Sequence, residues 1–236
     1  MSNRSIKKYF KERRVSYLGK TVLKDLTVDK PSEVKLIYPA IKKDYIIENY
    51  LLSETEDLLF FYKPPFMHSE RVNPDDELCL SDIVSENFPD YHPISRLDFE
   101  TDGIIAAMRR DVALYFQEKR YYAWVNGIIN ENFSFDKKVD ASKRKKVKIL
   151  SEKGDNILNF YVKKQSFGKT LLEISLNFAH RHQIRSILGY LGTPIVGDKL
   201  YGKGDWNRML LQCYYTKINS YECILDNKKL IEREIF

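Results

Sequence analysis

Short apolar runs and alternating apolar positions, both typical of β-strands, recur between residues 58 and 176. Residues 58–62 and 104–108 are short continuous apolar runs, and the first of them ends at Lys63-Pro64-Pro65. In residues 121–125, a strand would place Tyr121, Ala123 and Val125 on one face, and residues 172–176 alternate apolar with polar side chains. The pattern predicts four strands in this part of the chain, with Tyr121 on the apolar face of the third.

A helical period occurs near the end of the chain. Ile184, Ile187, Leu188 and Leu191 follow the spacing i, i+3, i+4, i+7, and Gly192 provides a stop signal. A second helix is predicted from Asp111, as the N-cap, to about Lys119. Strands and helices do not alternate regularly, so the sequence predicts a mixed α/β (α+β) fold with a largely antiparallel sheet.

The first forty residues have a different character. Their basic side chains recur at helical spacing and are followed by a turn at Gly19 and strand-like stretches at 22–28 and 34–38. We therefore divide the chain into a small N-terminal module, residues 1–40, and a main domain, residues 41–236. The alternative is a solvated amphipathic helix that packs on the main domain. The basic positions are Arg4, Lys7, Lys8 and Lys11.

Composition narrows the range of partners. The net charge of +6 and the pI of about 9.0 favour a polyanion such as a nucleic acid. No apolar run approaches the roughly 18 residues of a membrane span, and the basic N-terminal stretch lacks the apolar core of a secretory signal. Three scattered cysteines indicate reduced thiols in a cytoplasmic protein. The basic run 143–146 either borders a nucleic-acid path or is a solvated loop.

Signals for cofactors are missing from the sequence. It has neither a GxGxxG turn nor a GxxxxGK[ST] loop, and His180 and His182 are two residues apart, which is the wrong spacing for one helix face. The sequence therefore predicts neither a cofactor nor a metal site.

Several ordered motifs together resemble the RluA family of RNA pseudouridine synthases, over roughly residues 51–211. They are Lys63-Pro64, Arg96-Leu97-Asp98 with Thr101 and Gly103, the stretch from Lys119 to Gly127, His182-Gln183-Ile184-Arg185, and the loop from Pro194 to Gly202. Residues 2–39 are similar to a shortened copy of the S4-like RNA-binding module, first seen in a ribosomal small-subunit protein. That similarity rests on the basic helix, the turn at residues 14–20 and the stretch 34–39.

The resemblance implies a cofactor-free enzyme that converts uridine into pseudouridine in structured RNA, and it assigns roles to individual residues. Asp98 would be the catalytic carboxylate, and Arg185 would pair with it. Arg96, on the same face as Asp98 if both lie in a strand, would help to hold the flipped-out nucleotide. Tyr121 would pack on the target uracil and could assist the final proton removal. The plainer alternatives are a surface Arg185 and a core Tyr121.

The sequence departs from the family pattern at Ser95, at Asp102, at residues 179–181 and at Phe66, where His, Ser, Gly-Arg-Thr and Gly are usual. These departures motivate one alternative, a non-catalytic RNA-binding protein on the same scaffold. A hydrolase that uses Asp98 differently is a second alternative, without a supporting Ser/His or metal pattern. Ribosomal RNA is the first expected substrate and transfer RNA the next, and we expect a monomer that does not bind membranes.

Overall fold

A computed structural model describes most of the main domain and part of the N-terminal segment. The described residues are 10, 15–22, 27, 29–36, 45–72, 78–142, 146–204, 206–226 and 231. None of the helices in these ranges is long and apolar enough to cross a membrane.

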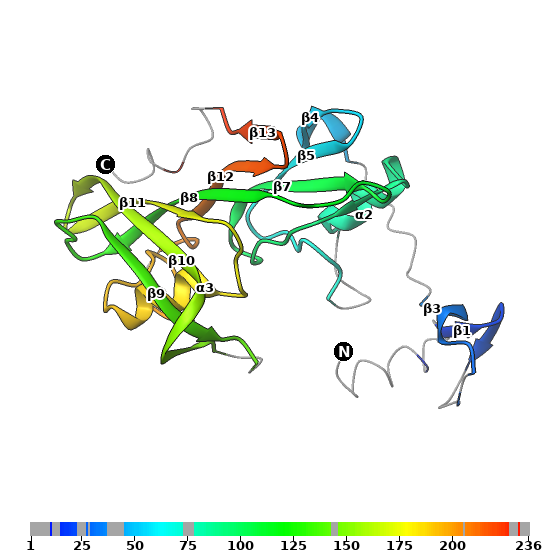
Figure 1. The fold of residues 1–236 in the computed structure, drawn as a ribbon, viewed down its shortest axis with the longest axis horizontal. Coiled ribbons are helices and arrows are strands. Elements are labelled where there is room, and N and C mark those ends of the chain that lie inside the picture. The colour runs from blue at the N-terminus through cyan, green and yellow to red at the C-terminus, as the bar shows by residue number, and fades with distance from the viewer. Residues whose placement is uncertain are drawn as a thin grey trace.

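The main domain is built on a large, strongly curved sheet, which contains ten strands among the described residues (Figure 1). All neighbouring strands are antiparallel except β7 and β12, which run parallel at the centre. This arrangement confirms the predicted α+β fold with a largely antiparallel sheet. The order across the sheet is β4 (Leu51–Glu54), β5 (Leu58–Lys63), β7 (Asp102–Arg109), β12 (Leu211–Ile218), β8 (Gln117–Asn126), β11 (Lys169–Leu176), β10 (Lys148–Ser166) and β9 (Phe133–Asp140), with β6 (Tyr91–Pro93) beside β7 and β13 (Tyr221–Ile224) beside β12.

Alternation along the strands divides the core between the two faces of the sheet. In β5, Leu59 and Phe61 belong to the cluster on one face, whereas Leu58 and Phe60 belong to a cluster on the other. The short run 58–62 is apolar throughout because both of its faces are buried. In β8, Tyr121 shares the first cluster with the predicted apolar positions of β11.

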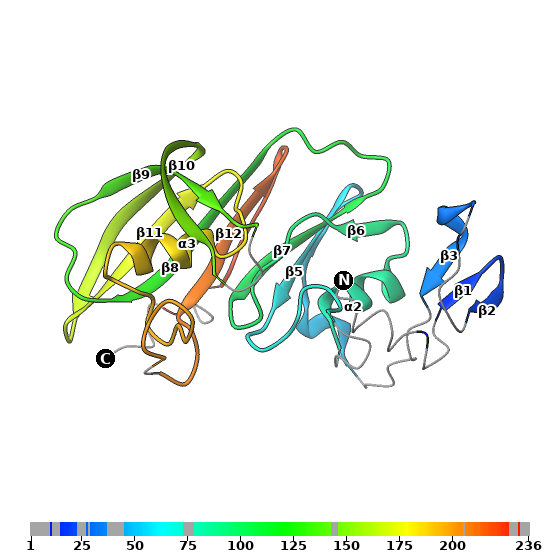
Figure 2. The ribbon, with the colours of Figure 1, turned by 90° about the horizontal axis from the view of Figure 1, so that it is seen from below.

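Two helices cover one face of this sheet. α2 (Leu80–Asn87) and α3 (Gln183–Tyr190) bury their apolar sides in the same cluster. Figure 2 shows α2 near β6, and Figures 1 and 2 show α3 near β10. The helix predicted from the spacing of Ile184 and its neighbours is confirmed, and the chain turns after it at Gly192, where φ is 78°.

The helix predicted from Asp111 to Lys119 is wrong. Residues 111–116 form a turn and a loop, and β8 starts at Gln117. Asp111 instead accepts a hydrogen bond from Nε of Arg109 at 2.6 Å. β8 is paired with β11 on one side and with β12 on the other, and this long-range pairing outweighs a local capping signal.

The N-terminal segment contributes a separate three-stranded sheet of β1 (Val15–Tyr17), β2 (Lys20–Val22) and β3 (Val34–Leu36), with a short 3-10 helix η1 (Pro31–Glu33) before β3. The turn predicted at Gly19 joins β1 to β2. The basic positions of the helix predicted at residues 4–11 lie outside the described residues, as does most of the strand predicted at 22–28. A second 3-10 helix, η2 (Ile47–Asn49), leads into β4.

Candidate active site

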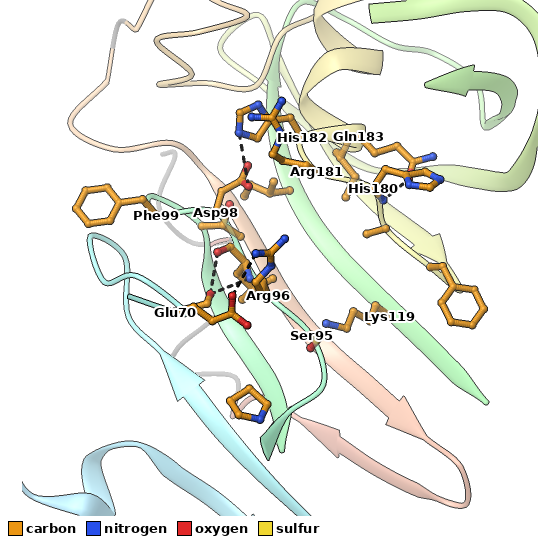
Figure 3. A pocket seen from close by; sticks show the side chains of 18 of the residues that line it. Glu70, Ser95, Arg96, Asp98, Phe99, Lys119, His180, Arg181, His182 and Gln183 are labelled. Atoms are coloured by element: carbon orange, nitrogen blue, oxygen red, sulfur yellow. Dashed lines mark hydrogen bonds and ion pairs between the residues drawn. The ribbon is translucent and has the colours of Figure 1, made fainter. Parts of the chain in front are cut away.

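A pocket of about 640 Å³ lies over the middle of the sheet, on the face that carries the two helices. Its walls come from the loops at 68–72 and 93–99, from residues 117–121 of β8 and from residues 178–185, which lead into α3. Figure 3 shows side chains from these separate segments pointing into one space. The pocket therefore unites the motifs around Asp98, Tyr121 and Arg185.

Asp98 lies in a loop whose backbone is held in place on both sides. Before it, the hydroxyl of Ser69 donates to the carbonyl of Leu97 at 2.8 Å and accepts from the amide of Leu97 at 3.0 Å. After it, the amide of Thr101 donates to the carbonyl of Asp98 at 3.1 Å. Residues 94–98 are not part of a strand, so the condition under which Arg96 and Asp98 would share one strand face is not met.

The Lys63-Pro64 motif also holds the loop that carries Asp98. The buried ammonium of Lys63 donates to the carbonyls of Pro64 at 2.9 Å, Met67 at 2.8 Å and Phe99 at 3.3 Å. Burial lowers the pKa of Lys63 to about 8. Phe66 adopts a left-handed φ of 63°, which explains why glycine is usual there, and its amide also donates to Phe99.

Arg185 forms the electrostatic centre of the pocket. Its Nη1 lies 2.8 Å from Oδ2 of Asp98, while Nε and Nη2 contact the two oxygens of Asp198 at 2.8 and 2.9 Å. Asp198 is fully buried and also accepts backbone hydrogen bonds from Leu200 and Tyr201. Burial alone would raise the pKa of Asp198, but the contacts with Arg185 outweigh it and the pKa is lowered. A bidentate ion pair thus fixes the guanidinium that faces Asp98.

His182 lies near the carboxylate oxygen of Asp98 that Arg185 does not contact, with Nε2 3.8 Å from Oδ1 (Figure 3). It occupies a left-handed conformation, φ 54°, immediately before α3. Burial lowers the pKa of His182, and the nearby Arg185 and Arg181 act in the same direction while Asp98 opposes them. The neutral imidazole is therefore the favoured form beside the carboxylate.

Tyr121 lines the pocket from β8 and is only 4% exposed. Burial, with a smaller contribution from the Cys213 thiol, raises the pKa of Tyr121 well above its ordinary value. The phenol is therefore neutral at ordinary pH.

Arg96 lies at an exposed edge of the pocket, where its Nη1 is 3.2 Å from Oε2 of Glu70 (Figure 3). Both side chains are largely exposed, at 66% and 49%. An ion pair in such a position contributes little to stability, so Arg96 can exchange Glu70 for another anion at small cost.

The unusual Asp102 is not a second carboxylate of the pocket. It is buried at the start of β7, where it accepts hydrogen bonds from Arg208 at 2.8 Å, Gln212 at 2.6 Å and Tyr62 at 3.1 Å. This network joins β5, β7 and β12. Asp102 therefore supports the sheet and does not line the pocket.

Sequence reasoning did not assign roles to Asp198 and His182, although both occur in quoted motifs. Asp198 is held by Arg185 and by the amides that follow it, and His182 faces Asp98 from a distant part of the chain. Among the described residues, no group of three or more His, Cys, Asp or Glu side chains is placed to hold a metal ion. The basic residues 143–145 lie outside the described part of the chain.

Comparisons with known proteins find relatives among the pseudouridine synthases. The family model described as RNA pseudouridylate synthase matches residues 57–189. An uncharacterized RNA pseudouridine synthase of Helicobacter pylori is 27% identical over 186 residues, which cover 73% of this chain and 72% of the relative. Ribosomal large subunit pseudouridine synthase D of Borreliella burgdorferi is 31% identical over 146 residues, covering 56% and 44%. The solved structure of human RNA pseudouridylate synthase domain containing 1 matches with a TM-score of 0.63 at 21% identity, covering 80% of this chain and 88% of that one.

Proposed function

The chain belongs to the family of RNA pseudouridylate synthases, and on this premise we propose that it isomerises uridine in ribosomal RNA with Asp98 as the catalytic carboxylate. The observation that carries the assignment is the contact between Asp98 and Arg185 in a pocket large enough to admit a nucleotide. Arg185 supplies a positive counter-charge and, because Asp198 holds its other edge, fixes the position of the carboxylate.

The reaction is an isomerisation, so its atoms balance without a co-reactant. The bond from C1′ of the ribose to N1 of uracil breaks, and a bond from C1′ to C5 forms. C5 loses its proton and N1 gains one. Asp98 would begin this sequence either by attack on the nucleoside or by removal of a proton from the sugar.

The other lining residues fit the remaining tasks. The ring of Tyr121 would pack on the uracil, and its neutral phenol is a hydrogen-bonding group near C5. Arg96 would exchange Glu70 for a phosphate of the flipped-out nucleotide. Phe99 and Phe178 line the pocket with rings that are 43% and 58% exposed, which suits stacking on neighbouring unpaired bases.

Ribosomal RNA is the proposed substrate for two reasons. A relative is named a ribosomal large subunit pseudouridine synthase. In addition, the N-terminal residues resemble a module of a ribosomal protein. Extraction of a base from its stack costs a few kcal/mol, which phosphate contacts of a basic protein offset.

A tritium-release assay tests the proposal. Ribosomal RNA fragments and transfer RNA carry tritium at C5 of uridine, and of the alternatives considered only a synthase frees that hydrogen. We expect release from the ribosomal fragments, and pseudouridines missing from ribosomal RNA in cells that lack the gene. Binding of RNA without release would show a non-catalytic protein, and release confined to transfer RNA would correct the substrate.

A further inference from the structure

Lys119 is a buried cation that the assigned roles leave unused. It lies on β8 two residues before Tyr121, so the two side chains share the face of the strand that lines the pocket. The residue is 2% exposed. Among the described residues, its ammonium makes no hydrogen bond or ion pair, and its Nζ is not one of the fully enclosed unpaired atoms, so the group opens onto the pocket. Burial lowers the pKa of Lys119, and the nearby Cys213 thiol opposes this shift.

A buried ammonium without a partner is unfavourable to folding, because desolvation of a charge costs several kcal/mol unless hydrogen bonds replace the lost water. Lys63 shows the usual solution in this same protein, since three carbonyl oxygens surround its ammonium. Lys119 has no such set of acceptors. Groups that break this rule concentrate where a ligand completes them.

Ser95 provides a second unsatisfied group in the same pocket. Its hydroxyl oxygen is buried and has no hydrogen-bond partner. Figure 3 shows the amino group of Lys119 pointing toward Ser95, at the end of the pocket away from Asp98. The Lys119 ammonium can donate hydrogen bonds, and the Ser95 hydroxyl can donate or accept one. Both groups therefore face the part of the pocket into which a ligand bound at Asp98 would extend.

We propose that the ammonium of Lys119 donates a hydrogen bond to a carbonyl oxygen of the target uracil and stabilises the negative charge that the base acquires during the reaction. The inference rests on the proposed function. With the ribose at Asp98, the base extends into the pocket, and its imide edge meets Lys119 and Ser95. Ser95 accepts the N3–H of the uracil or donates to its other carbonyl.

The proposed contact with the ammonium becomes stronger as negative charge develops on the base during the reaction. When the bond from C1′ to N1 opens, the electron pair leaves with the base, and its charge spreads over N1 and the carbonyl oxygens. A contact with these oxygens is stronger in that state than with neutral uridine, so it accelerates the chemical step. The charge disappears when a ring electron pair forms the bond from C5 to C1′, and loss of the C5 proton and protonation of N1 complete the isomerisation.

Lys119→Met tests the inference, because methionine keeps the length and apolar stem of the side chain and removes only the charge. The matched control is Lys199→Met, since Lys199 is 61% exposed and its nearest anionic partner is Glu100 at 3.7 Å. Single-turnover tritium release at saturating enzyme measures the chemical step. Thermal unfolding and RNA binding at several salt concentrations separate the other roles that a lysine can have.

For Lys119→Met we expect a rate at least about tenfold lower, a Tm equal to or above that of the wild type and RNA affinity within about twofold. Lys199→Met should keep the wild-type rate. An unchanged rate in Lys119→Met would overturn the inference. A lower Tm would make Lys119 a structural residue, and a loss of affinity and salt dependence with an intact rate would make it a phosphate contact. If the wild type itself releases no tritium, the proposed function fails instead.

Discussion

Replacement of Arg185 by alanine should damage both stability and chemistry, whereas replacement of Arg181, four residues earlier, should damage neither strongly. Arg185→Ala removes one contact with Asp98 and two with Asp198. Asp198 is fully buried and loses its counter-charge. The loss of one partner of a buried pair costs about 3–5 kcal/mol, against about 0–1 kcal/mol for an exposed pair.

The pH dependence of this loss follows from the sign of the pKa shift. In the wild type the pKa of Asp198 is lowered, so its ionised form stabilises the native state above the unfolded value of about 3.9. That contribution disappears as the pH falls through the lowered pKa. Without Arg185, burial raises the pKa of Asp198 instead, and the ionised carboxylate destabilises the native state as the pH rises. The difference in free energy of unfolding between the wild type and Arg185→Ala should therefore be smaller at about pH 5 than at about pH 8.

Urea unfolding at both pH values measures the stability difference, and single-turnover kinetics measure the chemistry. We expect a rate about a hundredfold or more lower for Arg185→Ala and less than about tenfold lower for Arg181→Ala. Equal stability losses for the two variants, or a difference that widens on acidification, would refute the assignment of Arg185 to the buried pair.

Two further predictions concern the backbone and the N-terminal module. Gly103→Ala should destabilise the protein by about 2–5 kcal/mol in urea unfolding, because φ is 127° and a Cβ would lie 2.2 Å from the Cys213 carbonyl oxygen. The control Gly19→Ala, with open space around residue 19, should cost about 1 kcal/mol. Equal losses of stability in the two variants would contradict the packing argument. Removal of residues 1–40 should weaken RNA binding and reduce its salt dependence more than it slows the chemical step, and an unchanged salt slope would show that this segment does not bind RNA.

Local periodicity predicted the elements whose burial follows one face, such as α3 and the face of β8 that carries Tyr121. It failed at Asp111, because pairing between distant strands decided the structure of residues 117–126. It made no prediction for the backbone around Asp98, whose loop is held by Ser69 from another segment. Contacts of this kind leave no mark on local patterns.

Motif resemblance found Asp98 and Arg185, which lie in contact, but it gave no role to Asp198. The structure was needed to recognise the role of Asp198, because this residue lies in the loop after α3 and acts through the guanidinium of Arg185. Lys119 is a similar case. A charged residue in an alternating strand is expected to face solvent, yet this one lies on the buried face and lines the pocket.

The most direct test of the account is the turnover of Asp98→Asn on RNA that carries tritium at C5 of uridine. The change keeps the shape of the side chain and removes the ionised carboxylate, so folding and RNA affinity should match the wild type while tritium release is abolished. Retention of even about a tenth of the wild-type rate, a barrier change of only about 1.4 kcal/mol, would contradict the assignment of Asp98 as the catalytic carboxylate.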